Sequence, residues 1–408
     1  MNDQTCLRAL ARAYYEAAMD PVNWERMKLH RAVNDLKMIR PVVLIDEIPF
    51  HELNVDGSLT LRCTDPLYRE AEAWLRKKLF QWNYFPADMI LEPWYPVQKM
   101  IRTTGIGISV QDETIYFDPG REGIAAHAYK DQLSSPEDLE KIHLPEITYD
   151  REATVEKAAR LAEVFGDLLP IRLVGYPFHT GPWDLISEYR GVDALLTDLI
   201  EEPEFTHQVV EKLYACEESR LSQMEALGLL ELNPFSLHGT CALCSDLGRD
   251  YDGGPVRREH VWGRGFAQIL SAVSPAMHEE FEINYMKKLM AGCAVNYYGC
   301  CEPLDRKMHI VEKLPNLRKV SVTPWADVDI AAEAIGKRYV LANKPKPGAV
   351  ALRLDEDALR EEIGRTLDAV KRNGCSCDIV LKDISSAGHD LRNLVRWEQT
   401  VMELVRNF

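Results

Sequence analysis

The sequence predicts an α/β protein, a (β/α)8 TIM barrel preceded by a mostly helical N-terminal extension. Eight short apolar segments of strand type are spread along residues 86–408, and helical patterns separate most of them. An open doubly wound sheet is the alternative arrangement of the same elements. No Gly-x-Gly-x-x-Gly or P-loop motif follows any of the segments, which disfavours the nucleotide-binding forms of that alternative.

Size and composition are those of an ordinary globular protein. The chain has 408 residues, of which 46% are hydrophobic and 27% charged. A net charge of −16 argues against a nucleic-acid partner, because phosphates would be repelled. No apolar run reaches the ~20 residues of a membrane span, and the N-terminus has no signal pattern, so we expect a cytoplasmic protein. In that compartment the ten cysteines are reduced, as candidate ligands or as small core residues.

Residues 1–85 are predicted to form the extension, and residues 86–408 the barrel. Helical spacing recurs over residues 1–40 and 66–84, with a short β-prone run at 41–45 between them. Because no Gly/Ser/Pro-rich linker follows, we expect this extension to pack on the barrel as a layer.

The barrel strands are expected where apolar runs end in polar or turn residues. A hairpin over residues 105–118, turning at Gln111 and Asp112, is expected to interrupt the series. The clearest helix covers residues 204–227 and ends at Gly228. The eight expected strands are Met89–Glu92, Ile171–Tyr176, Leu229–Asn233, Phe266–Leu270, Ala294–Tyr298, Lys319–Thr323, Tyr339–Asn343 and Asp378–Asp383.

The C-terminal ends of these strands are where a barrel of this type places its chemistry. The residues there form a polar and aromatic rim, which suits a small organic substrate. Those expected to bind substrate are Glu92, Trp94, Tyr95, Asn296, Trp325 and Asn343. Those expected to transfer protons are Tyr176, His179, Tyr298 and Asp383. The structural alternative for His179 is that it caps a turn, and the alternative for Trp325 is that it packs in the core.

The segment Cys300-Cys301-Glu302 follows a buried strand and predicts a metal centre. Thiolates favour zinc among the common metals, and a catalytic zinc keeps three protein ligands and one open position. Neighbouring residues in an extended chain point to opposite sides, so one cysteine with Glu302 is the expected contribution of this segment. Partners would come from other strand ends, where His238, Cys241/Cys244 and Cys375/Cys377 are the candidates. Cys377 is kept as a candidate, although it lies at the wrong end of its strand. Packing thiols at a tight turn, and a merely hydrogen-bonded His238, are the alternatives.

Four segments, in order and spacing, resemble the uroporphyrinogen decarboxylase superfamily, and together they cover residues 165–400. The strongest is Gly181-Pro182-Trp183-Asp184-Leu185-Ile186-Ser187-Glu188-Tyr189-Arg190-Gly191, followed by 194–199 and 203–204. The others are Gln268–Phe281 with its Ser274-Pro275 helix start, Tyr298–Cys300, and Ala342-Asn343-Lys344-Pro345. The first 80 residues look more like the extended N-terminus of anaerobic methyltransferase members.

The resemblance implies a barrel fold and either porphyrinogen decarboxylation or zinc-assisted methyl transfer involving a corrinoid protein or a thiol. The methyltransferases carry His-x-Cys at the strand that corresponds to Tyr298-Gly299-Cys300, and a later cysteine. Here Cys300 matches the first thiol, Tyr298 replaces the histidine, and Cys377 or Asp383 stands near the later position. The arginine-rich N-terminal motif and catalytic aspartate of the decarboxylases have no counterpart.

The first functional hypothesis is therefore a Zn²⁺-dependent methyltransferase. It would move a methyl group from a small methylated substrate, for which the aromatic rim makes an aryl methyl ether one candidate, to a corrinoid carried by a partner protein. The alternatives are a metal-independent decarboxylase or lyase using His179 with Asp383 or Asp327, and a non-catalytic ligand-binding barrel. The resemblance also leaves a homodimer open.

Overall fold

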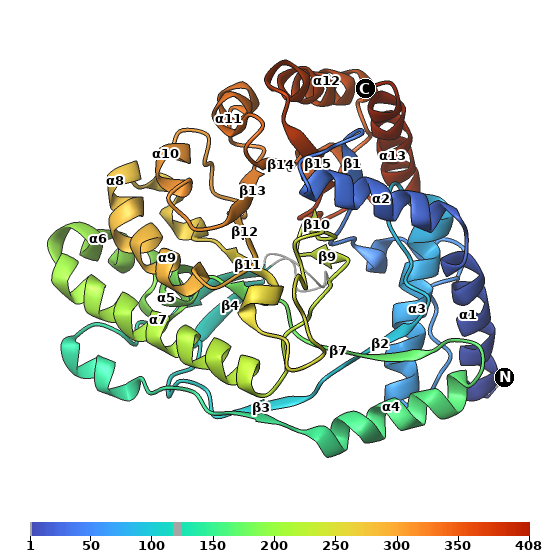
Figure 1. Cartoon of the computed structure of the whole chain (residues 1–408), viewed down its shortest axis with the longest axis horizontal. Coiled ribbons are helices and arrows are strands. Elements are labelled where there is room, and N and C mark those ends of the chain that lie inside the picture. Colours follow the sequence, from blue (N-terminus) through green and yellow to red (C-terminus); the bar gives the residue numbers. More distant parts are fainter. Residues whose placement is uncertain (1, 117–124) are drawn as a thin grey trace.

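A parallel sheet of seven strands lies at the centre of the molecule (Figure 1). The computed structural model describes residues 2–116 and 125–408. The strand order is β1-β15-β14-β13-β12-β11-β8, and every neighbouring pair is parallel. The strands are β1 Val42–Ile45, β8 Phe178–Thr180, β11 Trp262–Gly265, β12 Val295–Tyr298, β13 Leu317–Val322, β14 Val340–Asn343 and β15 Ser376–Leu381.

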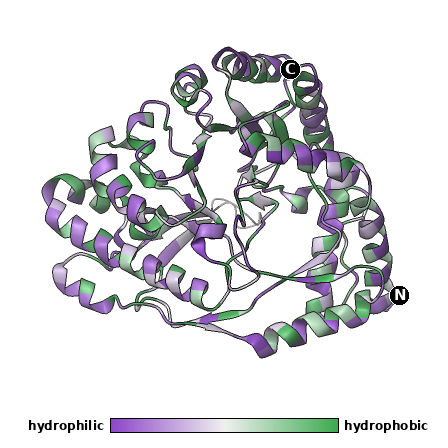
Figure 2. Ribbon diagram, viewed as in Figure 1, coloured by the Kyte–Doolittle hydropathy of each residue, from purple (hydrophilic) through white to green (hydrophobic). Residues whose placement is uncertain are grey.

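Helices surround this sheet on its outer side, and each carries hydrophobic and hydrophilic residues along its length (Figures 1 and 2). In α13, for example, Leu394, Trp397, Val401 and Val405 are buried, as in an amphipathic helix with one packed face. These helices are α5 Pro182–Arg190, α6 Val192–Glu201, α7 Pro203–Ala226, α8 Pro275–His278, α9 Asn284–Met290, α10 Met308–Val311, α11 Val328–Ile335, α12 Glu356–Asn373 and α13 Leu391–Arg406.

The N-terminal helices pack around a second core with the parallel pair β2 (Tyr95–Gln98) and β7 (Ile171–Val174). Leu7 and Leu75 are completely buried there. The helices of this core are α1 Asp3–Ala18, α3 Pro66–Tyr84 and α4 Arg151–Phe165. Helix α2 Val22–Asn34 packs instead against β1 and β15 at the edge of the large sheet. The smaller elements are β3 Ile101–Thr103, β4 Asp112–Tyr116, β5 Ala125–Tyr129, β6 Ile147–Tyr149, η1 Phe50–Glu52, η2 Pro136–Lys141, η3 Arg258–His260, η4 Gln268–Ala272, η5 Glu279–Ile283 and η6 Pro347–Val350.

The sheet has an outer face toward the helices and an inner face that is covered by a short hairpin. Alternate residues of a strand point to opposite faces. On β12, Tyr298 therefore belongs to the large core shared with the helices, while Tyr297 packs in a separate inner cluster with Trp262. The inner face also carries charged residues, which is unusual for a buried surface.

The covering hairpin consists of β9 (Ser236–Leu237) and β10 (Thr240–Cys241). It is anchored by the ion pair of Lys319 and Asp378, whose side chains are both fully buried and 2.9 Å apart. Lys319 Nζ also donates to Thr240 Oγ1 at 2.7 Å and to the Cys241 carbonyl at 2.8 Å, and the Thr240 hydroxyl donates to Asp378. Although burial alone would raise the pKa of Asp378, Lys319 and Lys344 lower it.

Several expected strands differ from the observed ones. The last four are confirmed, with small shifts of their ends. Ile171–Tyr176 is observed as β7, paired with β2 outside the seven-stranded sheet. Leu229–Asn233 forms only an isolated bridge between Leu230 and Tyr176. In place of Phe266–Leu270, the strand is β11, four residues earlier, and the apolar run begins a 3-10 helix.

Met89–Glu92 is not a strand, because side chains of helix α2 form hydrogen bonds with its backbone. Arg26 donates to the Met89 carbonyl at 2.9 Å, and Asn23 accepts from the Leu91 N–H at 2.9 Å. The edge position beside β15 is filled instead by β1. This strand comes from residues 1–85, while the division into an extension and a barrel stays a prediction.

The α/β class and the parallel order are confirmed, but the hydrogen-bonded ring of a barrel is not closed between β8 and β1. The hairpin expected at 105–118 was placed wrongly, since β4 begins at Asp112 and pairs with β5. Its last two expected residues, 117 and 118, lie outside the described residues. Within the described part of the chain, no helix combines the length and the hydropathy that crossing a membrane requires.

The buried ion pair gives a first testable prediction. Replacing Lys319 by Met strands the Asp378 carboxylate, so K319M should lower the free energy of unfolding by about 3–5 kcal/mol. Adding D378N removes the stranded charge and should recover part of that loss. Urea unfolding of the two variants measures both values, and equal losses would contradict the role of the ion pair.

Candidate functional site

Two adjacent thiols stand at the C-terminal end of β12. The chain turns there at Gly299, whose φ of +99° favours glycine. The buried Glu302 carboxylate holds the turn by accepting from the Cys300 N–H at 2.9 Å and the Ala267 N–H at 3.0 Å. The Ser321 hydroxyl donates to the Cys300 carbonyl at 2.8 Å. Glu302, expected as a metal ligand, therefore supports the backbone of the thiol pair.

The thiols face each other and share one ammonium group. Cys300 Sγ and Cys301 Sγ are 3.8 Å apart. Lys382, from the end of β15, places Nζ 3.8 Å from the first and 3.9 Å from the second. The next residue, Asp383, pairs with Lys382 at 2.7 Å and accepts from the Cys301 thiol at 3.6 Å. The structure thus brings Cys300, Cys301 and Asp383 together, from two strands that β13 and β14 separate.

His238 reaches this cluster from the tip of the covering hairpin. The tip turns at Gly239, with φ of +65°, and a Cβ there would lie 2.6 Å from Lys382 Cδ. His238 Nε2 lies 3.1 Å from the Glu47 carboxylate. Glu47 in turn accepts from the Asp383 N–H at 2.7 Å. The hairpin, β1 and β15 thus converge beside the thiols.

The surroundings favour the thiolate form of Cys300. A hydrogen bond from the Cys301 thiol lowers the pKa of Cys300 most. A hydrogen bond with His238 and the positive charges of Arg264 and Lys382 lower it further, against the effect of burial. The same pairing raises the pKa of Cys301. One thiolate and one thiol therefore share the site.

His179, on β8, lies next to His238, and the centroids of the two imidazole rings are 5.9 Å apart. Arg264 Nη1, from β11, donates to the His179 imidazole. Burial lowers the pKa of His179 to about 3, with help from Arg264 and His238. A neutral imidazole at physiological pH is consistent with a hydrogen-bond acceptor for the arginine.

Three of the predicted site residues point to the outer face, away from the thiols. The hydroxyl of Tyr298, a residue expected to transfer protons, lies 2.8 Å from His278 Nε2 and donates to the Glu282 carboxylate at 3.3 Å. Asn296 donates to the carbonyls of Met290 and Pro315. Cys377 is packed in the outer core, and burial raises its pKa well above the usual value. The period-two alternation of the strands explains all three placements.

The residues predicted at the end of the first expected strand, together with Tyr176 at the end of the second, serve the N-terminal layer. Tyr95 packs in the second core, 5.0 Å from Trp74 between ring centroids. Trp94 lies under Arg172, whose guanidinium carbon is 4.9 Å from the ring centroid. Burial raises the pKa of Glu92 to about 7. The Tyr176 hydroxyl donates to the Lys99 carbonyl at 2.6 Å.

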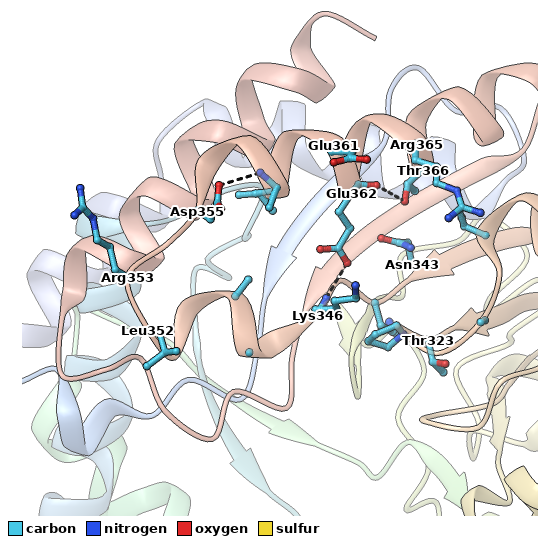
Figure 3. A pocket seen from close by; sticks show the side chains of 18 residues that line it. Thr323, Asn343, Lys346, Leu352, Arg353, Asp355, Glu361, Glu362, Arg365 and Thr366 are labelled. Atoms are coloured by element: carbon cyan, nitrogen blue, oxygen red, sulfur yellow. Dashed lines mark hydrogen bonds between the residues drawn. The ribbon is translucent and has the colours of Figure 1, made fainter.

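Asn343 lies at the rim, in a groove between the ends of β13 and β14 and helix α12 (Figure 3). Trp325 is exposed and stands in the chain between Pro324 and Ala326, which also line this groove. Asn343 lines this groove, which has a volume of about 670 Å³. Its opposite wall is α12, where Glu362 accepts from the Lys346 N–H at 3.1 Å. Lys344, also in the lining, donates to the Gly239 carbonyl and so connects the groove to the hairpin tip.

A second thiol pair, Cys6 and Cys63, lies with Glu72 in the N-terminal layer. Among the described residues, this is the one group whose three donor atoms all lie within 4.8 Å of one another. However, Glu72 already accepts from the N–H groups of Arg62 and Cys63 and from Arg76 at 2.7 Å. Burial and Glu72 also raise the pKa of both cysteines. The group is therefore a structural brace, with protonated thiols and an occupied carboxylate.

Three charged residues at the centre were not among the predicted site residues. Arg264 stands between two glycines and before the strand that was expected, so no apolar pattern marked it. Lys382 follows directly on β15. Its position between the end of an apolar strand and Asp383, a predicted site residue, could have identified it as a further site residue. Glu47 follows β1, a strand that was assigned to the extension.

No protein-family model matches the sequence, and no curated protein matches it. The fold is similar to that of a solved structure, a methyltransferase from Methanosarcina mazei, with a TM-score of 0.51. The similarity covers 93% of this chain and 98% of the other, at 14% sequence identity. At this identity the similarity establishes a shared fold.

A thiolate at neutral pH is directly measurable. In metal-free protein, Cys300 should contribute thiolate absorbance near 240 nm that persists well below the usual thiol pKa of about 8.5. C300S should remove this absorbance, and K382M should move its titration to higher pH because a neutralising charge is lost. C293S, a substitution of a buried thiol whose pKa is raised to about 12, is the matched control. Absorbance that first rises near pH 8.5 would contradict the lowered pKa.

Proposed function

We propose that this protein is a methyltransferase that moves a methyl group from a small methylated compound, an aryl methyl ether, to a corrinoid carried by a partner protein. The observation that carries the proposal is the Cys300 thiolate beside a second thiol at a strand end. The fold similarity to a methyltransferase adds support. The resemblance to the uroporphyrinogen decarboxylase superfamily suggests zinc and the corrinoid.

The spacing of the two sulfurs at this site suits zinc. Two sulfurs bound at about 2.3 Å to one tetrahedral ion lie about 3.8 Å apart, and Cys300 Sγ and Cys301 Sγ are 3.8 Å apart. This spacing removes the objection that adjacent cysteines point apart. Among the described residues, no other His, Cys, Asp or Glu donor lies within 4.8 Å of both sulfurs. His238, which helps to lower the pKa of Cys300, and Asp383, which contacts Cys301, would supply the remaining ligands after moving toward the ion. When bound, the metal would act as a Lewis acid on the heteroatom that carries the methyl group.

The surrounding residues have separate tasks in this proposal. Lys382 neutralises the negative charge of the thiols and is held in place by Asp383. Glu47 orients the His238 imidazole, as carboxylates do for histidine ligands. Glu302 and Ser321 fix the backbone of the thiol pair. His179, neutral and partly exposed, is the group positioned to donate a hydrogen bond from its other ring nitrogen to the leaving oxygen, and the proton that this oxygen finally takes would come from water.

Metal analysis tests the proposed ligands. The purified protein should hold about one zinc per chain, and C300S or C301S should lower the zinc affinity by about tenfold or more. Two controls should keep their zinc: C377A, because that thiol faces the helices, and C6A/C63A, because that pair is a brace. Mass spectrometry of dialysed samples gives the metal content, and full zinc in C300S/C301S would contradict the assignment.

Methyl transfer is measured with a Co(I) corrinoid as acceptor and methoxybenzene compounds as donors. The account predicts one methylcobalt species formed per ether cleaved, and a decrease of about 100-fold or more in H238A and C300S, the scale at which loss of metal-site groups reduces activity. Release of CO₂ from the same compounds without metal would favour the decarboxylase alternative instead.

A further inference from the structure

Arg264 is a buried guanidinium with an unused pair of donors. The residue is 1% exposed, on the inner face of β11. Its Nη1 donates to the neutral His179 imidazole, while Nε and Nη2 have no hydrogen-bond partner among the described residues. No carboxylate in that part of the chain forms an ion pair with it. A buried charge without such a partner is costly, so it indicates a group that the protein alone does not supply.

The two unused atoms form the side of the guanidinium that matches a carboxylate. Nε and Nη2 point in the same direction, and together they make the fork that holds two oxygens at once. Arg190 in the same chain uses this fork: its Nε and Nη2 lie 2.7 and 3.1 Å from the two oxygens of Asp198. Arg264 presents the same fork with the carboxylate missing.

The rings around Arg264 hold it in position without using the fork. The guanidinium carbon lies 4.8 Å from the Phe266 ring centroid and 5.2 Å from that of Tyr297. Such contacts act on the faces of the guanidinium plane and leave its edge free. The hydroxyl of Tyr297, on the same inner face, is also buried without a partner. Two polar groups with unmet hydrogen bonds thus lie on adjacent strands.

The fork is also close to the chemistry. Arg264 is one of the charges that lower the pKa of Cys300, and His179 connects it to His238, whose side chain is 37% exposed. Lys382, on the far side of the thiols, already has Asp383 as its partner. Arg264 is therefore the cation available to a substrate that enters beside the two histidines.

We infer that Arg264 is the subsite for the carboxylate of the substrate, so that the methyl donor is a small organic acid. The inference rests on the proposed function for the identity of that substrate as a methyl donor, but the carboxylate subsite is measurable without turnover. Nε and Nη2 each donate to one carboxylate oxygen, and the rest of the molecule extends toward the thiols.

A matched pair of ligands tests the subsite on the intact wild-type protein. 3-Methoxybenzoate and 3-methoxybenzamide have nearly the same shape and differ in charge. Calorimetric titration should show the acid binding about 10- to 100-fold more tightly, the effect of charge-assisted hydrogen bonds. Equal affinities would overturn the inference and would mean that the aromatic rings and buried water satisfy the guanidinium. Tighter binding of inorganic phosphate than of the acid would overturn the choice of a carboxylate.

Variants locate the effect. R264Q should abolish the preference for the acid, and R264K, which keeps the charge but loses the fork, should restore a minor part of it. R190Q, which alters an occupied fork elsewhere, should leave the preference unchanged. If R264Q fails to fold, the wild-type ligand pair still decides. A preference that persists in folded R264Q would contradict the assignment.

The two proposals fail differently. If the acid binds through Arg264 but no methyl group reaches a Co(I) corrinoid, the subsite stands and the proposed function falls. If the amide and the acid are demethylated with equal kcat/KM, the function stands and the subsite falls.

Discussion

The buried ion pair of Lys319 and Asp378 is the constraint on which the arrangement of the site depends. Both charges lie on the inner face of the sheet without solvent, where ions are stable only if they are paired and hydrogen-bonded. The remaining hydrogen bonds come from Thr240 and the backbone of Cys241 in the hairpin β9–β10. The hairpin is therefore fixed in depth and register, which sets the position of His238 at its tip.

The fixed hairpin explains why donors from distant parts of the sequence meet. His238 and Gly239 lie over Lys382, which contacts the thiols that end β12. Glu47, after β1, joins His238 to the backbone of Asp383 after β15. A thiolate surrounded by Lys382, Arg264 and two histidines is stabilised by charge. The same cations make the inner face suitable for an anionic substrate, so the thiolate and the proposed carboxylate subsite share one electrostatic cause.

The sequence carried enough information to predict the parallel α/β fold and the thiol pair. Apolar runs bounded by turn residues marked β12, β13, β14 and β15, because these strands are buried on both faces. Prediction failed where a strand lacked that pattern. The Gly-Arg-Gly of β11 has no apolar periodicity, and the apolar run after it folds as a 3-10 helix that buries Leu270. The run at Met89 looked like a strand, but the side chains of Asn23 and Arg26 satisfy its backbone, a tertiary effect that local patterns do not contain.

The candidate site was also predictable only where a local sequence pattern, the end of an apolar strand, marked its residues. Cys300, Cys301, His179, His238 and Asp383 follow strands or turns and were found from that position. Tyr298 and Asn296 were predicted to face the site because they lie at the end of a strand, but the alternation along β12 turns both of them toward the helices. Arg264 and Glu47 depend on pairings between strands that no single segment reveals.

The central claim is that the two thiols and His238 form one metal centre, and X-ray absorption at the zinc edge of the purified protein tests it most directly. The account predicts two sulfur scatterers at about 2.3 Å and at least one nitrogen at about 2.0–2.1 Å. A zinc coordination shell made of oxygen and nitrogen alone would contradict it, because Cys300 and Cys301 would then not bind the metal.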